Sequence, residues 1–391
     1  MNSDTSTMVE PVEACDPTHK RESLGTSRPE RNRGREAPDW LDRGQIPALN
    51  GMRAIAVSFV LLVHSLRAPG FFTSPTLRHF ISHGHIGVDI FFVISGFLIT
   101  TLLAREYERH GRIDLKRFYV RRSLRIVPAY CAFLLVMAIC QYAGEFHIPS
   151  RDWIAALTYT TNFLYHPSWE LGHTWSLSVE EHFYLIWPIV LFLAGAAGGW
   201  RMAWGCVAVC WFLRCIVSLV LPLVMAPADV SYFSALAENS TFTRLDTISM
   251  GCLLALACRS DYWRGWLDSL TRPPLMALYA ITIFASLELG ASAKFHLCLF
   301  YTLSGFCIAL LVWGLVRNDG LLRRCLDNRV LSTMGIGSYS IYLWQQLFIH
   351  PSQPGWIHAF PQNIVLVLGV AFLSYRFVET PMNRLKDCVT A

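Results

Sequence analysis

The sequence predicts an all-α polytopic membrane protein with about ten transmembrane helices. Of its 391 residues, 53% are hydrophobic and only 16% are charged, a composition outside the range of ordinary soluble domains. Apolar runs of about 16 to 24 residues recur from Pro47 to Val378, and runs of this length are typical of membrane-spanning helices. Clusters of arginine separate several of these runs, as expected for loops that stay on one side of a bilayer.

The chain begins with a polar segment that is not expected to fold. Residues 1–46 are rich in Pro, Gly, Ser, Arg and Glu and contain almost no apolar clustering, so they predict a disordered cytoplasmic tail. The segment lacks the apolar stretch of a signal peptide, and the first span is therefore expected to direct insertion. One membrane domain then covers residues 47–381, and residues 382–391 form a short cytoplasmic tail.

The apolar runs predict the spans one by one. In chain order, the expected spans are approximately Pro47–Leu66, Ile86–Ala104, Leu124–Tyr142, Leu177–Ala196, Met202–Met225, Leu245–Cys258, Pro274–Leu289, Phe295–Val316, Met334–His350 and Asn363–Val378. The segment Trp153–Tyr165 has only about 13 residues, which is short for a span, so we expect it to be interfacial or re-entrant.

Positive charge predicts the orientation of these spans. The most basic segment follows the second span and contains Arg105, Arg109, Arg112, Lys116, Arg117, Arg121, Arg122 and Arg125. Basic loops also occupy 259–273 and 317–330. Such loops usually face the cytoplasm, which places both termini there and makes nucleic-acid binding a poor interpretation of the charge. The expected location is the inner, or plasma, membrane, with the lipid bilayer as the surrounding partner.

Two groups of potential metal ligands have simpler explanations. Most of the twelve cysteines lie inside apolar segments without any Cys-x-x-Cys pair, so they are expected to pack as small hydrophobic residues. The segment between the first two spans contains His79, His83 and His85. No acidic residue or cysteine accompanies these histidines as a further ligand, so a solvated loop is the favoured interpretation and no metal is predicted.

The first span carries the most informative pair of residues. Arg53 and His64 are eleven positions apart, close to three helical turns, so their side chains share one face and are separated by roughly 16 Å. An ionisable residue in a span is costly and normally faces the interior of the bundle. We hypothesise that this helix holds the two ends of one extended substrate.

The predicted orientation gathers further charged residues at each end of this helix. Asp89, Glu180 and Glu181 are expected near the outer side with His64, although only one of the adjacent glutamates is expected to face the interior. Arg53, Arg121, Arg122 and Arg125 are expected together at the inner side. For the last three, the positive-inside signal alone is an alternative explanation.

An acyl-CoA fits this arrangement. Arginines bind phosphate oxygens in bidentate geometry, and the pantetheine arm is long enough to cover the spacing between Arg53 and His64. His64 would take a proton from an alcohol, with a carboxylate that orients its imidazole. Direct transfer and an acyl-histidine intermediate both remain open. A transporter for a glycan or small anion is the alternative of another class, although the sequence lacks the paired halves common in transporters.

Several motifs resemble those of acyltransferase family 3. They are Arg53 and His64 with ten residues between them, Gly87–Ile99, Arg122–Pro128, Trp175–Tyr184, Ser338–Trp344 and Tyr375–Pro381. The resemblance covers residues 47–381 in order. Two departures are Met52, where leucine is usual, and His182, where glutamine is common.

The resemblance implies an integral membrane enzyme that moves an acyl group, usually acetyl, from CoA to a hydroxyl. It carries over Arg53 and His64 as a paired essential set, Arg122 and Arg125 as the CoA-side pair, and Asp89 with Glu180 or Glu181 as further site residues. Family acceptors are mostly glycans such as exopolysaccharide, lipopolysaccharide or lipo-oligosaccharide, and a macrolide or other small alcohol is the alternative. Polysaccharide-assembly proteins are compatible as partners. The additional esterase-like domain of some relatives is not expected here.

Overall fold

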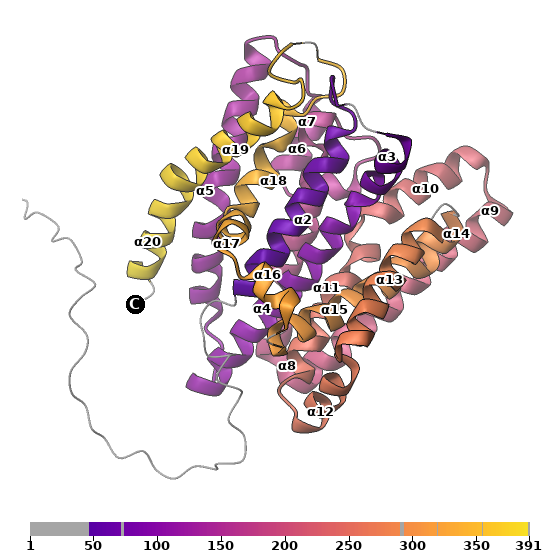
Figure 1. The fold of residues 1–391 in the computed structure, drawn as a ribbon, viewed down its shortest axis with the longest axis vertical. Coiled ribbons are helices and arrows are strands. Elements are labelled where there is room, and N and C mark those ends of the chain that lie inside the picture. The colour runs from indigo at the N-terminus through magenta and orange to yellow at the C-terminus, as the bar shows by residue number, and fades with distance from the viewer. Residues whose placement is uncertain (1–46, 72–73, 290–292, 319, 354, 390–391) are drawn as a thin grey trace, which may run out of the picture.

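The computed structural model describes residues 47–71, 74–289, 293–318, 320–353 and 355–389 (Figure 1). Within these residues the chain is built from helices and contains no strand, which confirms the predicted all-α fold class. The tail predicted to be disordered, residues 1–46, lies outside the described residues.

The elements follow one another with short connections. The first half comprises α2 (Pro47–Ser65), α3 (Pro75–Ser82), the 3₁₀ turn η1 (His83–His85), α4 (Ile86–His110), α5 (Leu115–Tyr142), α6 (Ser150–Leu157), η2 (Thr161–Phe163), α7 (Trp169–Gly172) and α8 (Thr174–Cys215). The middle comprises η3 (Ile216–Val220), α9 (Leu221–Val224), α10 (Pro227–Asn239), α11 (Thr241–Ala257), α12 (Asp261–Leu270) and α13 (Pro273–Leu289). The last part comprises α14 (Ala293–Phe295), η4 (His296–Phe300), α15 (Tyr301–Arg317), α16 (Leu321–Leu326), α17 (Arg329–Ile336), α18 (Ser338–Phe348), α19 (Gln362–Ser374), η5 (Tyr375–Glu379) and α20 (Thr380–Val389).

Six helical stretches in the described residues are long and apolar enough to cross a membrane, or seven if the pair α12 and α13, bent by 73°, forms one span. One of them, Trp169–Val224, has 56 residues and would extend about 84 Å, more than twice the ~30 Å hydrocarbon core. It contains two of the predicted spans and bends at Gly195, whose φ is 62°. The chain is thus a multi-pass protein, while the count of ten spans and the cytoplasmic side of the termini remain predictions.

Several short helices are not predicted by the sequence pattern. The expected loop before the second span contains α3 and η1, and Ser74 caps α3 by accepting a hydrogen bond from the Leu77 amide at 3.2 Å. Helix α10 was not predicted, and α20 extends through most of the expected C-terminal tail. Helices α3, α10 and α20 have 8 to 13 residues and η1 has 3, so they lack the long apolar run by which spans are recognised.

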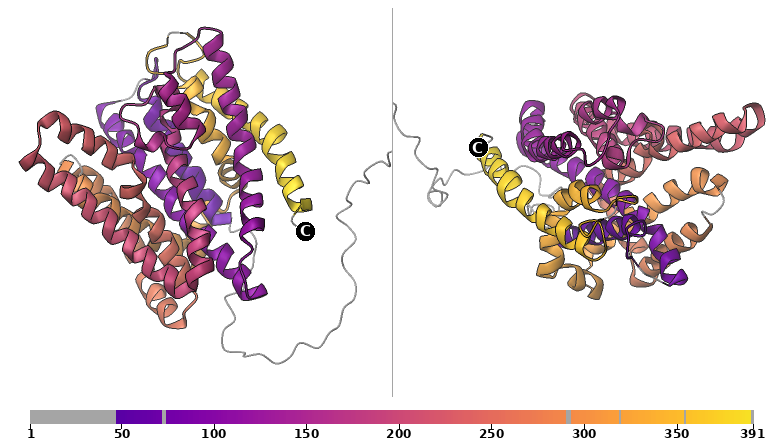
Figure 2. Two further views of the ribbon diagram at one scale, coloured as in Figure 1. Left: turned by 180° about the vertical axis from the view of Figure 1, so that it is seen from behind. Right: turned by 90° about the horizontal axis from the view of Figure 1, so that it is seen from above.

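Helix α11 lies at the centre of the bundle and packs against α4, α8 and α15 (Figure 2). Glycines permit its close crossing with α4. A Cβ atom at Gly96 would overlap the Ile248 carbonyl oxygen, and one at Gly251 would overlap the Val93 carbonyl oxygen. Small residues at such crossings allow helix backbones to approach closely in a membrane. This crossing determines the position of α4, whose opposite face lines the cavity described below.

Gly96→Ala should therefore destabilise the protein, because α4 and α11 must separate to accept the methyl group. We expect a loss of about 1–3 kcal/mol, as for other overpacked cores. Thermal unfolding of the detergent-solubilised protein measures this loss. Gly205→Ala is the matched control, since a Cβ at Gly205 on α8 meets no atom within 4 Å. Equal unfolding midpoints for the two variants would contradict the role of this crossing.

Candidate functional site

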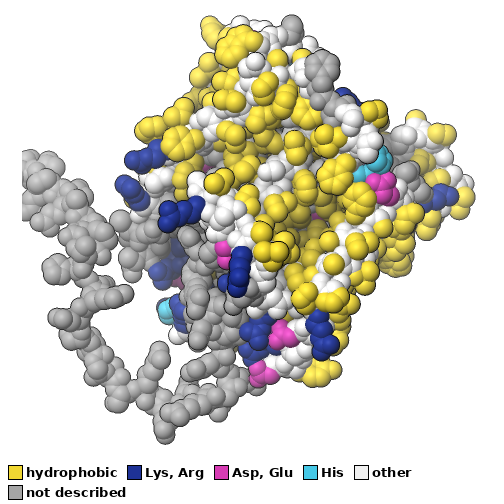
Figure 3. Space-filling model, viewed as in Figure 1, with side chains coloured by type: hydrophobic (Ala, Val, Ile, Leu, Met, Phe, Trp, Pro, Cys, Tyr) yellow, Lys and Arg dark blue, Asp and Glu magenta, His cyan; other side chains and the backbone are white. Residues whose placement is uncertain are grey.

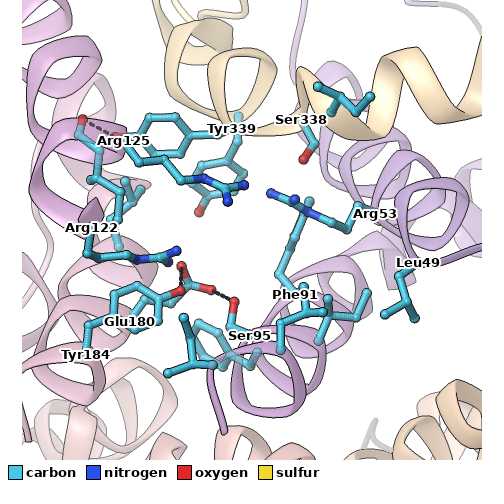
Figure 4. Close-up of a pocket in the computed structure, with 18 of the residues that line it drawn as sticks. Leu49, Arg53, Phe91, Ser95, Arg122, Arg125, Glu180, Tyr184, Ser338 and Tyr339 are labelled. Carbon is cyan, nitrogen blue, oxygen red and sulfur yellow. Dashed lines mark hydrogen bonds between the residues drawn. The ribbon is translucent and has the colours of Figure 1, made fainter. Parts of the chain in front are cut away.

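An elongated cavity of about 550 Å³ lies between α2, α4, α5, α8 and α18 (Figure 4). On α4 its lining extends from Val88 to Arg105, which corresponds to about 25 Å along the helix axis. Its polar and charged lining consists of Asn50, Arg53, Ser95, Thr101, Arg105, Arg122, Arg125, Ser176, Glu180, Glu181, Tyr184, Ser338, Tyr339, Tyr342, Tyr375, Glu379 and Asn383. The cavity is long enough to hold an extended ligand.

Three of the predicted arginines point into this cavity. Figure 4 shows Arg53 on one wall and Arg122 and Arg125 on the opposite wall, with their guanidinium groups directed toward the shared space. Arg122 and Arg125 are three positions apart on α5, so they lie on the same helix face. The guanidinium of Arg122 stacks on the Tyr184 ring at 3.6 Å, and its Nε is buried without a hydrogen-bond partner in the described residues. This end of the cavity is suited to bind an anion.

Arg121, predicted to bind the same ligand, is not among the residues that line the cavity. Its NH2 donates to Glu106 Oε2 at 3.2 Å on α4. It follows that Arg121 and Arg122, adjacent in sequence, differ in their environment because neighbouring side chains on a helix diverge by about 100°.

Glu180 and Glu181 both line the cavity, so the expectation that only one of them faces the interior is wrong. Glu180 accepts hydrogen bonds from Ser95 Oγ at 2.8 Å and from the Tyr184 hydroxyl at 3.0 Å. The two glutamates were predicted to lie near His64, but the structure places them with the arginines. The cavity is wide enough to expose two neighbouring positions of α8.

The cavity carries a small formal excess of positive charge. Four arginines face three glutamates in the lining, a difference of one positive charge. Two of the glutamates accept hydrogen bonds from neutral hydroxyls, since Ser340 donates to Glu379 and Ser95 to Glu180. Among the described residues no ion pair joins Arg53, Arg122 or Arg125 to these carboxylates. The guanidinium groups thus remain available to a ligand with several negative charges.

His64 lies beyond the other end of the cavity and is not among its lining residues. Its Nδ1 is 3.0 Å from Gln345 Oε1, and its ring meets the Trp169 ring edge-on at 5.5 Å. An amide oxygen can only accept, so Nδ1 carries the proton and Nε2 keeps a lone pair. An amide, and not the predicted carboxylate, orients the imidazole.

Asp89, a candidate for that carboxylate, is engaged elsewhere. It is 2% exposed and pairs with Arg244 of α11, whose guanidinium lies over the Tyr301 ring at 3.8 Å. A second buried pair joins Arg214 to Asp246 at 2.5 Å. The Asp89–Arg244 pair joins α4 to α11, and removing one partner of such a buried pair would leave an uncompensated charge.

A layer of hydrogen-bonded side chains separates the cavity from His64. The Tyr342 hydroxyl contacts Ser176 Oγ at 2.6 Å and donates to the His173 carbonyl oxygen at 2.9 Å. Tyr342 and Ser176 line the cavity, and Gln345 is one helical turn further along α18. A ligand that extends from the arginines to His64 must pass beside this layer.

Gln345, whose side chain is fully buried, was not predicted as a site residue from the sequence. The signal was present, because Gln345 and Gln346 interrupt the apolar run of α18, and buried polar residues in a span are usually functional. Glu379 and Tyr339 lie inside quoted motifs but received no role. Nothing local distinguishes Arg105, which also lines the cavity, from the other arginines of its basic segment.

Comparison with known proteins gives a consistent family assignment. A family model described as an acyltransferase domain matches residues 46–376. The O-acetyltransferase OatA of Staphylococcus aureus (strain NCTC 8325 / PS 47) is 31% identical over 372 residues, which is 87% of this chain and 57% of the relative. A second Staphylococcus aureus protein (strain COL), provisionally named as an O-acetyltransferase, is 30% identical over 370 residues with the same two coverages. The chain thus spans little more than half the length of these relatives. No solved structure matches the chain.

Proposed function

This chain belongs to acyltransferase family 3, and from that premise we propose that it is a membrane O-acetyltransferase that moves acetyl from cytoplasmic acetyl-CoA to a hydroxyl of a glycan. The observation that carries the proposal is the elongated arginine-lined cavity that leads toward a histidine oriented by an amide. The names of the relatives support O-acetylation, and the membership argues against the transporter alternative.

The arginine end of the cavity is the proposed site for the phosphates of CoA. Arg53, Arg122 and Arg125 converge on one space, and planar guanidinium groups match phosphate oxygens with two parallel hydrogen bonds. The aromatic face of Tyr184 holds Arg122 in position by a cation–π contact. The pantetheine arm would then extend along α4 toward Tyr342.

His64 is the proposed general base. Its Nε2 takes the proton from the acceptor hydroxyl while that oxygen attacks the thioester carbonyl carbon. The C–S bond then breaks, the acetyl group stays on the acceptor oxygen, and the CoA sulfur leaves with the proton from His64. By accepting the Nδ1 proton, Gln345 leaves the Nε2 lone pair free before the proton transfer and again after it.

The aromatic surroundings of His64 support a sugar as the acceptor. Trp169 lies beside the imidazole, and its Nε1 donates to the Ile349 carbonyl oxygen at 2.7 Å, which fixes the ring. Arg67 lies over the same ring at 5.3 Å. An apolar ring face flanked by hydrogen-bonding groups is suited to bind a sugar.

Mass spectrometry of surface glycans tests this function. A deletion strain is complemented with the wild-type chain or with His64→Ala. Loss of an acetyl-sized mass increment that only the wild type restores supports the proposal. An unchanged glycan profile together with acetylation of a secreted small alcohol would replace the glycan acceptor, and substrate movement across vesicles without CoA would overturn the enzyme assignment.

Gln345→Leu should lower kcat by about 10²-fold while the KM for acetyl-CoA stays close to that of the wild type, because the variant loses only the orientation of the base. Gln345→Glu retains an acceptor oxygen for Nδ1 and should keep more activity than Gln345→Leu. Steady-state kinetics of the purified variants measures both constants. A rise in KM with kcat unchanged would show that Gln345 serves binding and does not position His64.

A further inference from the structure

A cluster of two histidines and one glutamate lies outside the proposed catalytic site. His79 and His83 are four positions apart on and just after α3, so they lie on the same side of the helix. Glu288, near the end of α13, approaches both: its Oε2 is 2.8 Å from His79 Nε2 and its Oε1 is 3.2 Å from His83 Nε2. The space-filling view shows histidine and acidic side chains side by side on this surface (Figure 3).

The fold brings an acidic residue to these histidines from a distant part of the chain. The sequence predicts no metal at these histidines because no acidic residue accompanies them locally, and Glu288 is 209 positions from His79. Contacts between Phe80 and Phe284, with ring centroids 5.8 Å apart, hold α3 against α13 and bring the three ligands together.

The geometry fits a cation between the three groups. Their ligand atoms lie within 4.8 Å of one another, and a tetrahedral zinc site separates its ligand atoms by roughly 3.3 Å. His83 Nε2 is buried and makes no hydrogen bond in the described residues, although the Glu288 carboxylate is 3.2 Å away. The Nε2 atoms of both histidines thus lie close to the two oxygens of one carboxylate, an arrangement that a shared cation would satisfy.

We propose that His79, His83 and Glu288 bind a zinc ion that joins α3 to α13. Two imidazole nitrogens and one carboxylate form a ligand set that zinc uses with a water in the fourth position. The ion links the segment that follows α2 to a helix far along the chain. It stabilises the packing of η1, where a Cβ at Gly84 would overlap the Phe59 carbonyl oxygen of α2. This role is independent of the proposed acetyl transfer.

The test measures zinc in the full-length protein, purified in detergent with a tag that contains no histidine. After incubation with zinc chloride and removal of free metal, elemental analysis should find about one zinc ion per chain. His83→Ala and Glu288→Gln should each retain less than about a tenth of that amount, since a site with two ligands binds weakly. His147→Ala, which removes an exposed histidine outside the cluster, should bind as the wild type does.

Thermal unfolding provides a second measurement. Zinc should raise the unfolding midpoint of the wild type and of His147→Ala, and excess EDTA should lower it again, because binding to the folded state stabilises it. Glu288→Gln should not respond to either addition. A wild-type protein that retains no zinc, or variants that retain as much as the wild type, would overturn the proposed site.

Discussion

His64→Ala is expected to reduce acetyl transfer by roughly 10²–10⁴-fold, the usual contribution of a general base. The Gln345 amide holds the His64 imidazole beside the proposed acceptor site at 3.0 Å, and Trp169 lies edge-on to it. Alanine leaves no group to take the proton from the acceptor hydroxyl. Transfer of radiolabelled acetyl from acetyl-CoA in membranes with equal amounts of each variant measures the loss.

The control for this experiment must separate a lost base from a lost fold. Affinity for CoA should stay within about twofold of the wild type in His64→Ala, since His64 does not line the cavity. His147→Ala removes an exposed histidine and should leave transfer unchanged. Normal transfer by a well-inserted His64→Ala protein would refute the assignment of the base.

Arg122→Ala should weaken acetyl-CoA binding by about 10- to 100-fold, because a hydrogen bond to a charged group contributes about 1.5–3 kcal/mol. Arg122 is directed into the cavity and stacks on Tyr184, so its loss removes a positioned phosphate ligand. Titration of purified protein with acetyl-CoA measures the change. Titration with dephospho-CoA, which lacks the 3′-phosphate, then shows whether Arg122 binds that phosphate. If it does, Arg122→Ala should bind the forms of CoA with and without the 3′-phosphate equally well.

The neighbouring residue provides a matched control. Arg121→Ala removes the same charge from the same helix, but Arg121 donates to Glu106 and does not line the cavity. Its affinity for acetyl-CoA should remain within about twofold of the wild type, as expected for loss of a partly exposed ion pair. Equal losses in the two variants would mean that the general positive charge of α5, and not a specific contact, attracts the ligand.

Local patterns in the sequence were sufficient for the fold class, for most of the long helices and for three of the arginines that line the cavity. Apolar run length indicated spans, since a helix must hide its backbone from lipid over a fixed thickness. Helical periodicity predicted that Arg53 and His64 share one face of α2. Arg122 and Arg125 both line the cavity, as expected for two residues three positions apart on a helix. These inferences depend on neighbours within a few turns of one helix.

Only the tertiary structure decided which partners these side chains meet. Gln345 is 281 positions from His64, Arg244 is 155 from Asp89, and Glu288 is 209 from His79. Each contact depends on which helices pack together and at what depth, and α11 reaches α4 only where glycines allow it. Since several carboxylates share the same predicted depth, the sequence alone assigned Asp89 and Glu180 or Glu181 to His64. Packing instead placed Asp89 against an arginine and Glu180 inside the arginine-lined cavity.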